Sequence, residues 1–180
     1  MSESKKKNYE TWFRMANSTT TDELSTEDLQ RVLCNRITEN GSKSYFSLET
    51  VKLLIRIVSK GKKSTVNLKE FEQLWEFLSL WRKLFKEYDK DDNGTLEKPE
   101  FESAVNKLGF KLQQNIIDII FDRFDVSGSG RMEFDDFIRV CLILRDLGKK
   151  FKSKSTDEEP DFALLSYNDF IEFVFTSAVF

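Results

Sequence analysis

Asp89-Lys-Asp-Asp-Asn-Gly-Thr-Leu-Glu-Lys-Pro-Glu100 is the stretch of this sequence that decides the fold. Gly94 lies in its middle and permits a sharp turn, because glycine has no Cβ and tolerates a positive φ. A loop that turns in this way brings alternate side chains to one point, as a hard cation with oxygen ligands requires. The oxygen-bearing residues of the stretch are Asp89, Asp91, Asn93, Thr95, Glu97 and Glu100.

These six residues occupy positions 1, 3, 5, 7, 9 and 12 of an EF-hand calcium loop, and Gly94 occupies position 6. Thr95 needs to supply only its backbone carbonyl, whereas Glu100 supplies two oxygens from the start of the following helix. The alternative is a polar loop between helices that binds nothing. Because every ligand position and the glycine match, the sequence predicts the main Ca²⁺ site here.

A second loop, residues 125–136, keeps the same frame with poorer ligands. Hydroxyls replace two of the carboxyl or amide oxygens, and the last residue is an aspartate, one methylene shorter than the usual glutamate. We expect a weak Ca²⁺ site, and whether it binds stays open. Position 8 is Leu96 in one loop and Met132 in the other, and we expect these two residues to join the loops in a short two-stranded contact. The ligand positions are Asp125, Ser127, Ser129, Arg131 through its backbone, Glu133 and Asp136.

Three further copies of the loop are degenerate, near residues 17–28, 59–70 and 155–168. The copy at 59–70 keeps Glu70 at its last position but contains several lysines, which repel a cation. We therefore expect this second hand to be structural. In the fifth copy, Pro160 replaces the turn glycine and blocks the usual wrap of the loop.

The first copy, residues 17–28, carries mostly hydroxyl oxygens. Its segment from Ser25 to Asp28 is typical of a helix N-cap, and we expect that role and weak or no Ca²⁺ binding. A rearranged loop that uses Asp22, Glu23 and Asp28 as ligands is the alternative.

Helical periodicity dominates the rest of the chain and predicts an all-α fold with about eight helices. Leu68 to Tyr88 and Glu133 to Phe151 each show apolar residues at helical spacing. Each of these two long helices is expected to leave one hand and enter the next. Short paired strands in the loops complete the predicted fold.

The composition restricts the function. The chain has 180 residues, 28 basic and 31 acidic residues, and a net charge of −3, so nothing indicates a nucleic-acid partner. We expect one domain over residues 9–180 after a disordered tail, residues 1–8, and no transmembrane segment. The sequence contains no histidine, which excludes Cys-His and Ser-His nucleophiles, so we expect a non-catalytic chain. Cys34 and Cys141 are expected to be free buried thiols in a reducing compartment, the cytoplasm.

Five hands with two shared helices resemble the penta-EF-hand family. The marks of the resemblance are Phe134–Ile138, Lys107–Phe110 and Leu68–Trp75. Within the family, the stretch Tyr45–Lys52 is most similar to the C-terminal domain of calpain large subunits. The absence of a Gly/Pro-rich extension also favours that domain. The resemblance implies a calcium-binding regulatory domain of an atypical calpain, an intracellular thiol protease. The alternative is a stand-alone adaptor whose main role is protein–protein interaction.

The resemblance also implies partners. In this family the fifth hand pairs with its equivalent in a second subunit, so we expect a homodimer or heterodimer through residues 155–180. A tethered protease core would be a further partner. The alternative for the fifth hand is that it packs onto its own domain. Its apolar residues are Leu164, Leu165, Phe170, Ile171, Phe173, Val174, Phe175 and Phe180.

Overall fold

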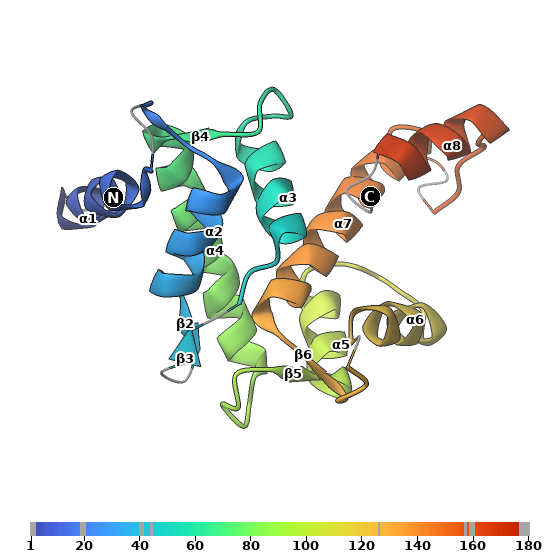
Figure 1. Cartoon of the computed structure of the whole chain (residues 1–180). Helices are drawn as coiled ribbons and strands as arrows, with labels where there is room; N and C mark the ends of the chain where they lie inside the picture. Colours follow the sequence, from blue (N-terminus) through green and yellow to red (C-terminus); the bar gives the residue numbers. More distant parts are fainter. Residues whose placement is uncertain are drawn as a thin grey trace. The chain divides into compact units, whose positions relative to one another are not determined.

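The computed structural model describes residues 3–18, 21–39, 42–43, 45–125, 127–156, 158 and 161–176. These residues form eight α-helices and three short two-stranded sheets. Figure 1 shows these elements, coloured along the chain. The predicted all-α fold is therefore confirmed. The chain divides into two compact units, Met1–Ile138 and Arg139–Phe180.

The first unit contains most of the predicted hands. Residues 3–8, which the sequence assigned to a tail, lie in the first helix, and the prediction of one domain over residues 9–180 stays a prediction. The elements of this unit, in chain order, are α1 (Glu3–Ala16), β1 (Glu23–Leu24), α2 (Thr26–Arg36), β2 (Thr38–Glu39), β3 (Ser42–Lys43), α3 (Leu48–Val58), β4 (Val66–Asn67), α4 (Leu68–Tyr88), β5 (Leu96–Glu97), α5 (Lys98–Lys107), α6 (Gln114–Phe124), β6 (Arg131–Met132) and the start of α7 (Phe134–Lys152).

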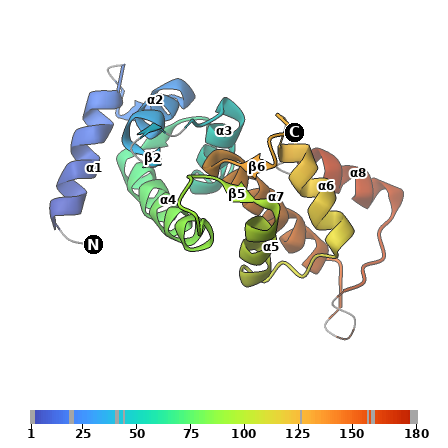
Figure 2. The ribbon, with the colours of Figure 1, turned by 90° about the horizontal axis from the view of Figure 1, so that it is seen from below.

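The loops are joined in antiparallel pairs. Leu24 pairs with Val66 between β1 and β4, and Leu96 pairs with Met132 between β5 and β6. All four side chains are fully buried. Figure 2 shows β5 and β6 side by side from below. The predicted contact between the third and fourth loops is therefore confirmed, and the first two loops form an equivalent contact.

The helix starts follow local capping chemistry. Ser25 accepts a hydrogen bond from the N–H of Asp28, and Asp28 accepts one from Ser25, so the predicted cap of α2 is confirmed. Asn67 and Glu70 form the same reciprocal pair at the start of α4. The long helix α4 covers the predicted range, residues 68–88.

Aromatic side chains form much of the core of the first unit. Phe85 of α4 is fully buried, and its ring lies 5.3 Å from that of Phe134 and 5.5 Å from that of Phe137, between ring centroids. At the other end of α4, Trp75 lies 5.0 Å from Trp12 of α1. Edge-on and tilted pairs at these distances are favourable beyond the area that they bury. This cluster fixes the start of α7 against α4 and thereby positions the fourth loop.

The second unit holds the rest of α7 and helix α8 (Tyr167–Thr176), joined by a segment in which Ser155 and Ala163 form an isolated β-bridge. The Nζ of Lys154 lies 2.6 Å from Oδ1 of Asp169 in the first turn of α8. No residue of α8 is buried. Pro160, on which the argument about the fifth loop depended, lies outside the described residues.

Two predictions about the chain as a whole can be compared with the structure. Neither Cys34 nor Cys141 is in a disulfide, but only Cys141 is buried, and burial raises the pKa of its thiol. Over the described residues, none of the helices combines the length and the apolar character that crossing a bilayer demands.

Candidate metal centre

The third loop begins where α4 ends and turns on the carboxylate of Asp89. This side chain is buried, and it accepts hydrogen bonds from the backbone N–H groups of Asn93 at 3.0 Å and Gly94 at 2.9 Å. Gly94 has a φ of 86°, the left-handed conformation predicted for the turn. The first ligand position therefore also holds the turn that the later positions need.

The middle positions of the loop are joined to one another. Asp91 accepts hydrogen bonds from the backbone N–H of Asn93 at 3.2 Å and from its side-chain amide at 2.7 Å. The side-chain carbonyl of Asn93 in turn accepts from the N–H of Thr95 at 2.8 Å and from its hydroxyl. The structure thus brings together four of the six predicted residues, Asp89 to Thr95.

Glu100 joins the two ends of the loop. Its Oε1 accepts a hydrogen bond from the N–H of Lys90 at 2.9 Å, and its Oε2 accepts one from the N–H of Glu97 at 3.1 Å. The second of these bonds caps the first turn of α5. The carboxylate predicted as a bidentate ligand therefore holds two backbone donors in this structure, while the side chain of Glu97 is exposed.

The two aspartates of the third loop differ in their protonation equilibria. Burial raises the pKa of Asp89, and the nearby charge of Asp91 adds to this effect, while the N–H groups of Gly94 and Asn93 oppose it. Burial acts to raise the pKa of Asp91, but hydrogen bonds from Asn93 outweigh this effect and lower the pKa. Asp91 thus disfavours the charged form of Asp89, and a cation close to both carboxylates would favour it.

The fourth loop lines a cavity of about 460 Å³. Asp125 organises this loop as Asp89 organises the third, and it accepts hydrogen bonds from the N–H groups of Ser129 at 2.9 Å and Gly130 at 2.6 Å. Burial acts to raise the pKa of Asp125, but these bonds outweigh it and lower the pKa. All six predicted positions line the cavity, whose residues are Thr95, Phe124, Asp125, Ser127, Ser129, Arg131, Glu133 and Asp136.

The donor groups of these loops suit Ca²⁺, because they are oxygens of carboxylates, amides, hydroxyls and backbone carbonyls. Over the described parts of the chain, however, no three acidic or cysteine side chains lie together as a group that could hold a metal ion. In the third loop the reason is plain. Asp89 and Asp91 lie within the turn, whereas the carboxylate of Glu100 is directed to the backbone of Lys90 and Glu97.

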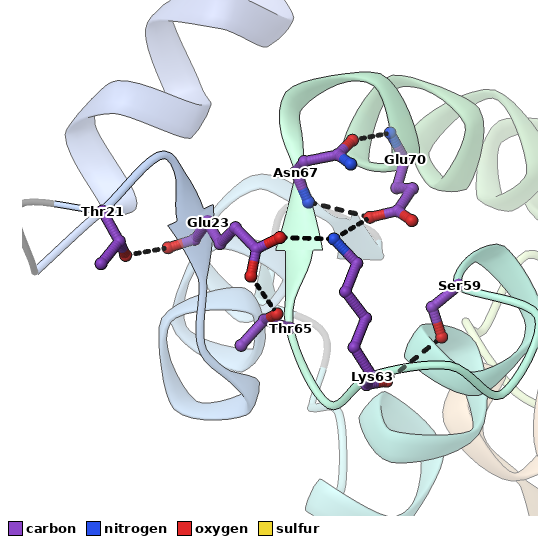
Figure 3. A network of polar contacts seen from close by, with 7 residues as sticks. All are labelled: Thr21, Glu23, Ser59, Lys63, Thr65, Asn67 and Glu70. Carbon is purple, nitrogen blue, oxygen red and sulfur yellow. Dashed lines mark hydrogen bonds and ion pairs between the residues drawn. The ribbon is translucent and has the colours of Figure 1, made fainter.

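The first two loops hold a polar network that the sequence interpretation missed. Glu23 of β1 and Glu70 of α4 both contact the ammonium of Lys63, as Figure 3 shows. Asp28 caps α2 and pairs with Arg31 at 3.0 Å. Two of the three residues of the alternative, rearranged first site are therefore engaged elsewhere. The signal that could have revealed the network is the lysine at loop position 5, where a ligand oxygen is expected.

Comparisons with known proteins agree with this geometry. The family described as an EF-hand domain pair matches residues 79–142, which contain the third and fourth loops. Sorcin of Mus musculus is 32% identical over 154 residues, which cover 86% of this chain and 76% of sorcin. Peflin of Mus musculus is 29% identical over 161 residues, which cover 89% of this chain and 56% of peflin.

A solved structure shows the same fold. It is a homologue of programmed cell death 6 protein from Leishmania major Friedlin, with a TM-score of 0.74, 20% identity, and coverage of 93% of this chain and 92% of that chain. These relationships confirm the prediction that Ca²⁺ is the cofactor. They also confirm the prediction that the chain has no catalytic role. The chain belongs to the penta-EF-hand family.

Proposed function

We propose that this chain is a calcium-responsive adaptor of the cytoplasm, in which the third loop is the main Ca²⁺ site. The observation that carries the proposal is the preformed turn of that loop, in which Asp89 already holds the N–H groups of Asn93 and Gly94. A ligand loop that is ordered beforehand loses less conformational entropy when it binds an ion. The ligands would be Asp89, Asp91, Asn93, the Thr95 carbonyl, Glu97 and Glu100.

Glu100 is the residue through which Ca²⁺ binding would change the structure outside the loop. Its carboxylate holds the N–H groups of Lys90 and Glu97, at the two ends of the loop. When Glu100 binds the ion, its carboxylate gives up these two backbone contacts, and the first turn of α5 moves. The strand pair of Leu96 and Met132 links this movement to the fourth loop, for which we propose weaker binding by Asp125, Ser127, Ser129, Arg131, Glu133 and Asp136.

A calcium titration by calorimetry tests the main site. Glu100→Gln removes one charged ligand oxygen, and we expect it to weaken Ca²⁺ binding by about tenfold or more. Glu102→Gln, two residues further along α5, is the matched control and should bind as the wild type does. Equal binding by the Glu100 variant and the wild type, or no binding by either, would show that the third loop is not the site.

The proposed partner is a second copy of the chain or of a related subunit, bound through the fifth hand. Helix α8 exposes several large apolar side chains, among them Phe170, which is 52% exposed. An apolar surface of this kind is a feature of binding sites. The similarity to sorcin and peflin over most of this chain supports the stand-alone adaptor. The role as a calpain regulatory domain, with a tethered protease core, stays a prediction.

Sedimentation equilibrium tests the dimer. Phe170→Asp places a charge on the apolar face of α8, and we expect it to weaken association by about tenfold or more. Leu80→Asp is the control, because Leu80 is 70% exposed on α4, outside the fifth hand. A monomeric wild-type protein at high micromolar concentration, or an equal effect of both variants, would rule out the fifth hand as the interface.

A further inference from the structure

Lys63 lies at the place where the second loop would carry a ligand for a metal ion. Counted from Ser59, it occupies loop position 5, whose side chain points to the cation in a calcium loop. In Figure 3 the lysine side chain extends from this position to a point between Glu23 and Glu70. The Nζ atom lies 2.5 Å from Oε1 of Glu23 and 3.0 Å from Oε2 of Glu70.

The two carboxylates come from different hands. Glu70 occupies position 12 of the second loop, the position of the bidentate ligand in a calcium loop, and it also caps α4 through the N–H of Asn67 at 3.0 Å. Glu23 lies on β1 of the first loop, where its Oε2 accepts a hydrogen bond from the hydroxyl of Thr65. One ammonium group therefore joins the first loop to the second, as a single point charge with three donors can.

The surroundings keep these charges paired. The side chains of Lys63 and Glu70 are only 29% and 17% exposed, and that of Glu23 is 40% exposed. In the contact of β1 with β4, next to Glu23 in the chain, Leu24 and Val66 form a fully buried pair. The hydrogen bond to Glu23 and then that to Glu70 raise the pKa of Lys63, and the same contact lowers that of Glu23. Lys63 and Glu23 are thus both charged near neutral pH.

We propose that the ammonium of Lys63 is the permanent cation of the first pair of hands. It neutralises Glu70 in place of a metal ion and also reaches Glu23, so these two loops stay joined whether or not Ca²⁺ is present. The first pair then serves as a calcium-insensitive platform, and the response to calcium is restricted to the pair in residues 79–142. Only the contrast between the two pairs of hands rests on the proposed function, because it requires that the third and fourth loops respond to Ca²⁺.

Hydrogen exchange of the backbone amides, measured on the full chain with a calcium chelator and with Ca²⁺, tests the proposal. In the wild type, we expect exchange at Glu23, Leu24, Val66 and Asn67 to be the same in both conditions. Lys63→Met keeps the aliphatic stem but removes the charge, and it should speed exchange at these amides by about fivefold. Lys63→Arg keeps a cation and should remain close to the wild type.

Lys62→Met is the matched control, because Lys62 is an exposed lysine of the same loop. Glu23→Gln provides a second variant, since it weakens only the contact between the loops and should speed exchange in the same direction. Equal exchange in the Lys63→Met and Lys62→Met proteins would overturn the proposal, as would slower exchange of the four wild-type amides on addition of Ca²⁺. The amides of Leu96 and Met132 report separately on the third and fourth loops, so a failure of the proposed calcium response would be recognised there.

Discussion

The backbone N–H of Ser47 donates a hydrogen bond to Oδ2 of Asp135 at 3.2 Å, across 88 residues of the sequence. Ser47 is the N-cap of α3, and Asp135 lies buried in the first turn of α7. The neighbouring rings of Phe46 and Phe134 meet edge to face at 6.1 Å. The helix that begins the second hand and the helix that follows the fourth loop therefore share one buried contact.

Replacement of Asp135 by alanine should destabilise the protein by about 1–3 kcal/mol, because the half-buried N–H of Ser47 would lose its acceptor. Urea denaturation followed by circular dichroism measures this loss. Glu49→Ala removes an exposed carboxylate from the first turn of α3 and should cost less than about 1 kcal/mol. If the two variants were equally stable, the contact of Ser47 with Asp135 would make no contribution to the stability of the fold.

Local patterns were sufficient to predict much of this structure. The range of α4, the cap of α2 from Ser25 to Asp28, and the pairing of Leu96 with Met132 all follow from the spacing of residues within one hand. Such features depend on neighbours in sequence, or on a loop frame that repeats. The six oxygen positions of the third loop were assigned in the same way, and their role as Ca²⁺ ligands stays a prediction.

Contacts between distant side chains could not be predicted. The pairing of Lys63 with Glu23 and the bond from Ser47 to Asp135 depend on how the helices pack, because helical periodicity identifies a buried face but not its partner. The contacts of Glu100 with Lys90 and Glu97 were also missed. The loop pattern describes this residue only as a ligand, whereas its carboxylate can equally serve as a helix cap.

Two glycine substitutions should change stability in opposite directions. Gly94→Ala should destabilise the protein by about 1 kcal/mol, because alanine disfavours the φ of 86° in the third loop. Gly148→Ala should stabilise it by about 0.5–1 kcal/mol, since Gly148 lies within α7 and an added Cβ would meet no atom within 4 Å. Thermal unfolding of both variants, with a calcium chelator present, measures the two effects. A gain in stability for the Gly94 variant would contradict the turn described here.

Acid should weaken the start of α8 in a defined range of pH. The contact with Lys154, followed by hydrogen bonds from Ser166, lowers the pKa of Asp169 from 3.8 to about 2. A carboxylate with a lowered pKa stabilises the folded state fully above its unfolded pKa, and this stabilisation is lost as the pH falls through the folded value. We therefore expect the contribution of Asp169 to be complete above about pH 5 and to disappear between about pH 4 and 2.

A carboxyl NMR titration of Asp169 measures its pKa directly. Chemical shifts of the α8 amides, recorded in parallel, should follow the same transition. In Asp169→Asn these amides should lose that transition, because the variant has no acid to titrate at this position. An Asp169 pKa at the ordinary value would show that the contact of Asp169 with Lys154 does not persist in solution.

Lengthening Asp136 by one methylene should strengthen the fourth loop as a Ca²⁺ site. Asp136 lines the same cavity as Asp125 and Glu133, and it occupies the position where a glutamate normally supplies two oxygens. With the third loop weakened by Glu100→Gln, calorimetry reports mainly on the fourth. We expect the additional change Asp136→Glu to tighten binding by about tenfold, since the longer side chain reaches the ligand position with both oxygens.

The control for this prediction is Asp118→Glu in the same Glu100→Gln background. Asp118 lies on α6, before the loop, where its carboxylate is 3.3 Å from the Nζ of Lys98, so the added methylene should leave binding unchanged. If Asp136→Glu bound Ca²⁺ no more tightly than this control, the length of the last ligand would not limit the fourth loop. Its weakness would then lie with the hydroxyls of Ser127 and Ser129, which offer the ion no negative charge.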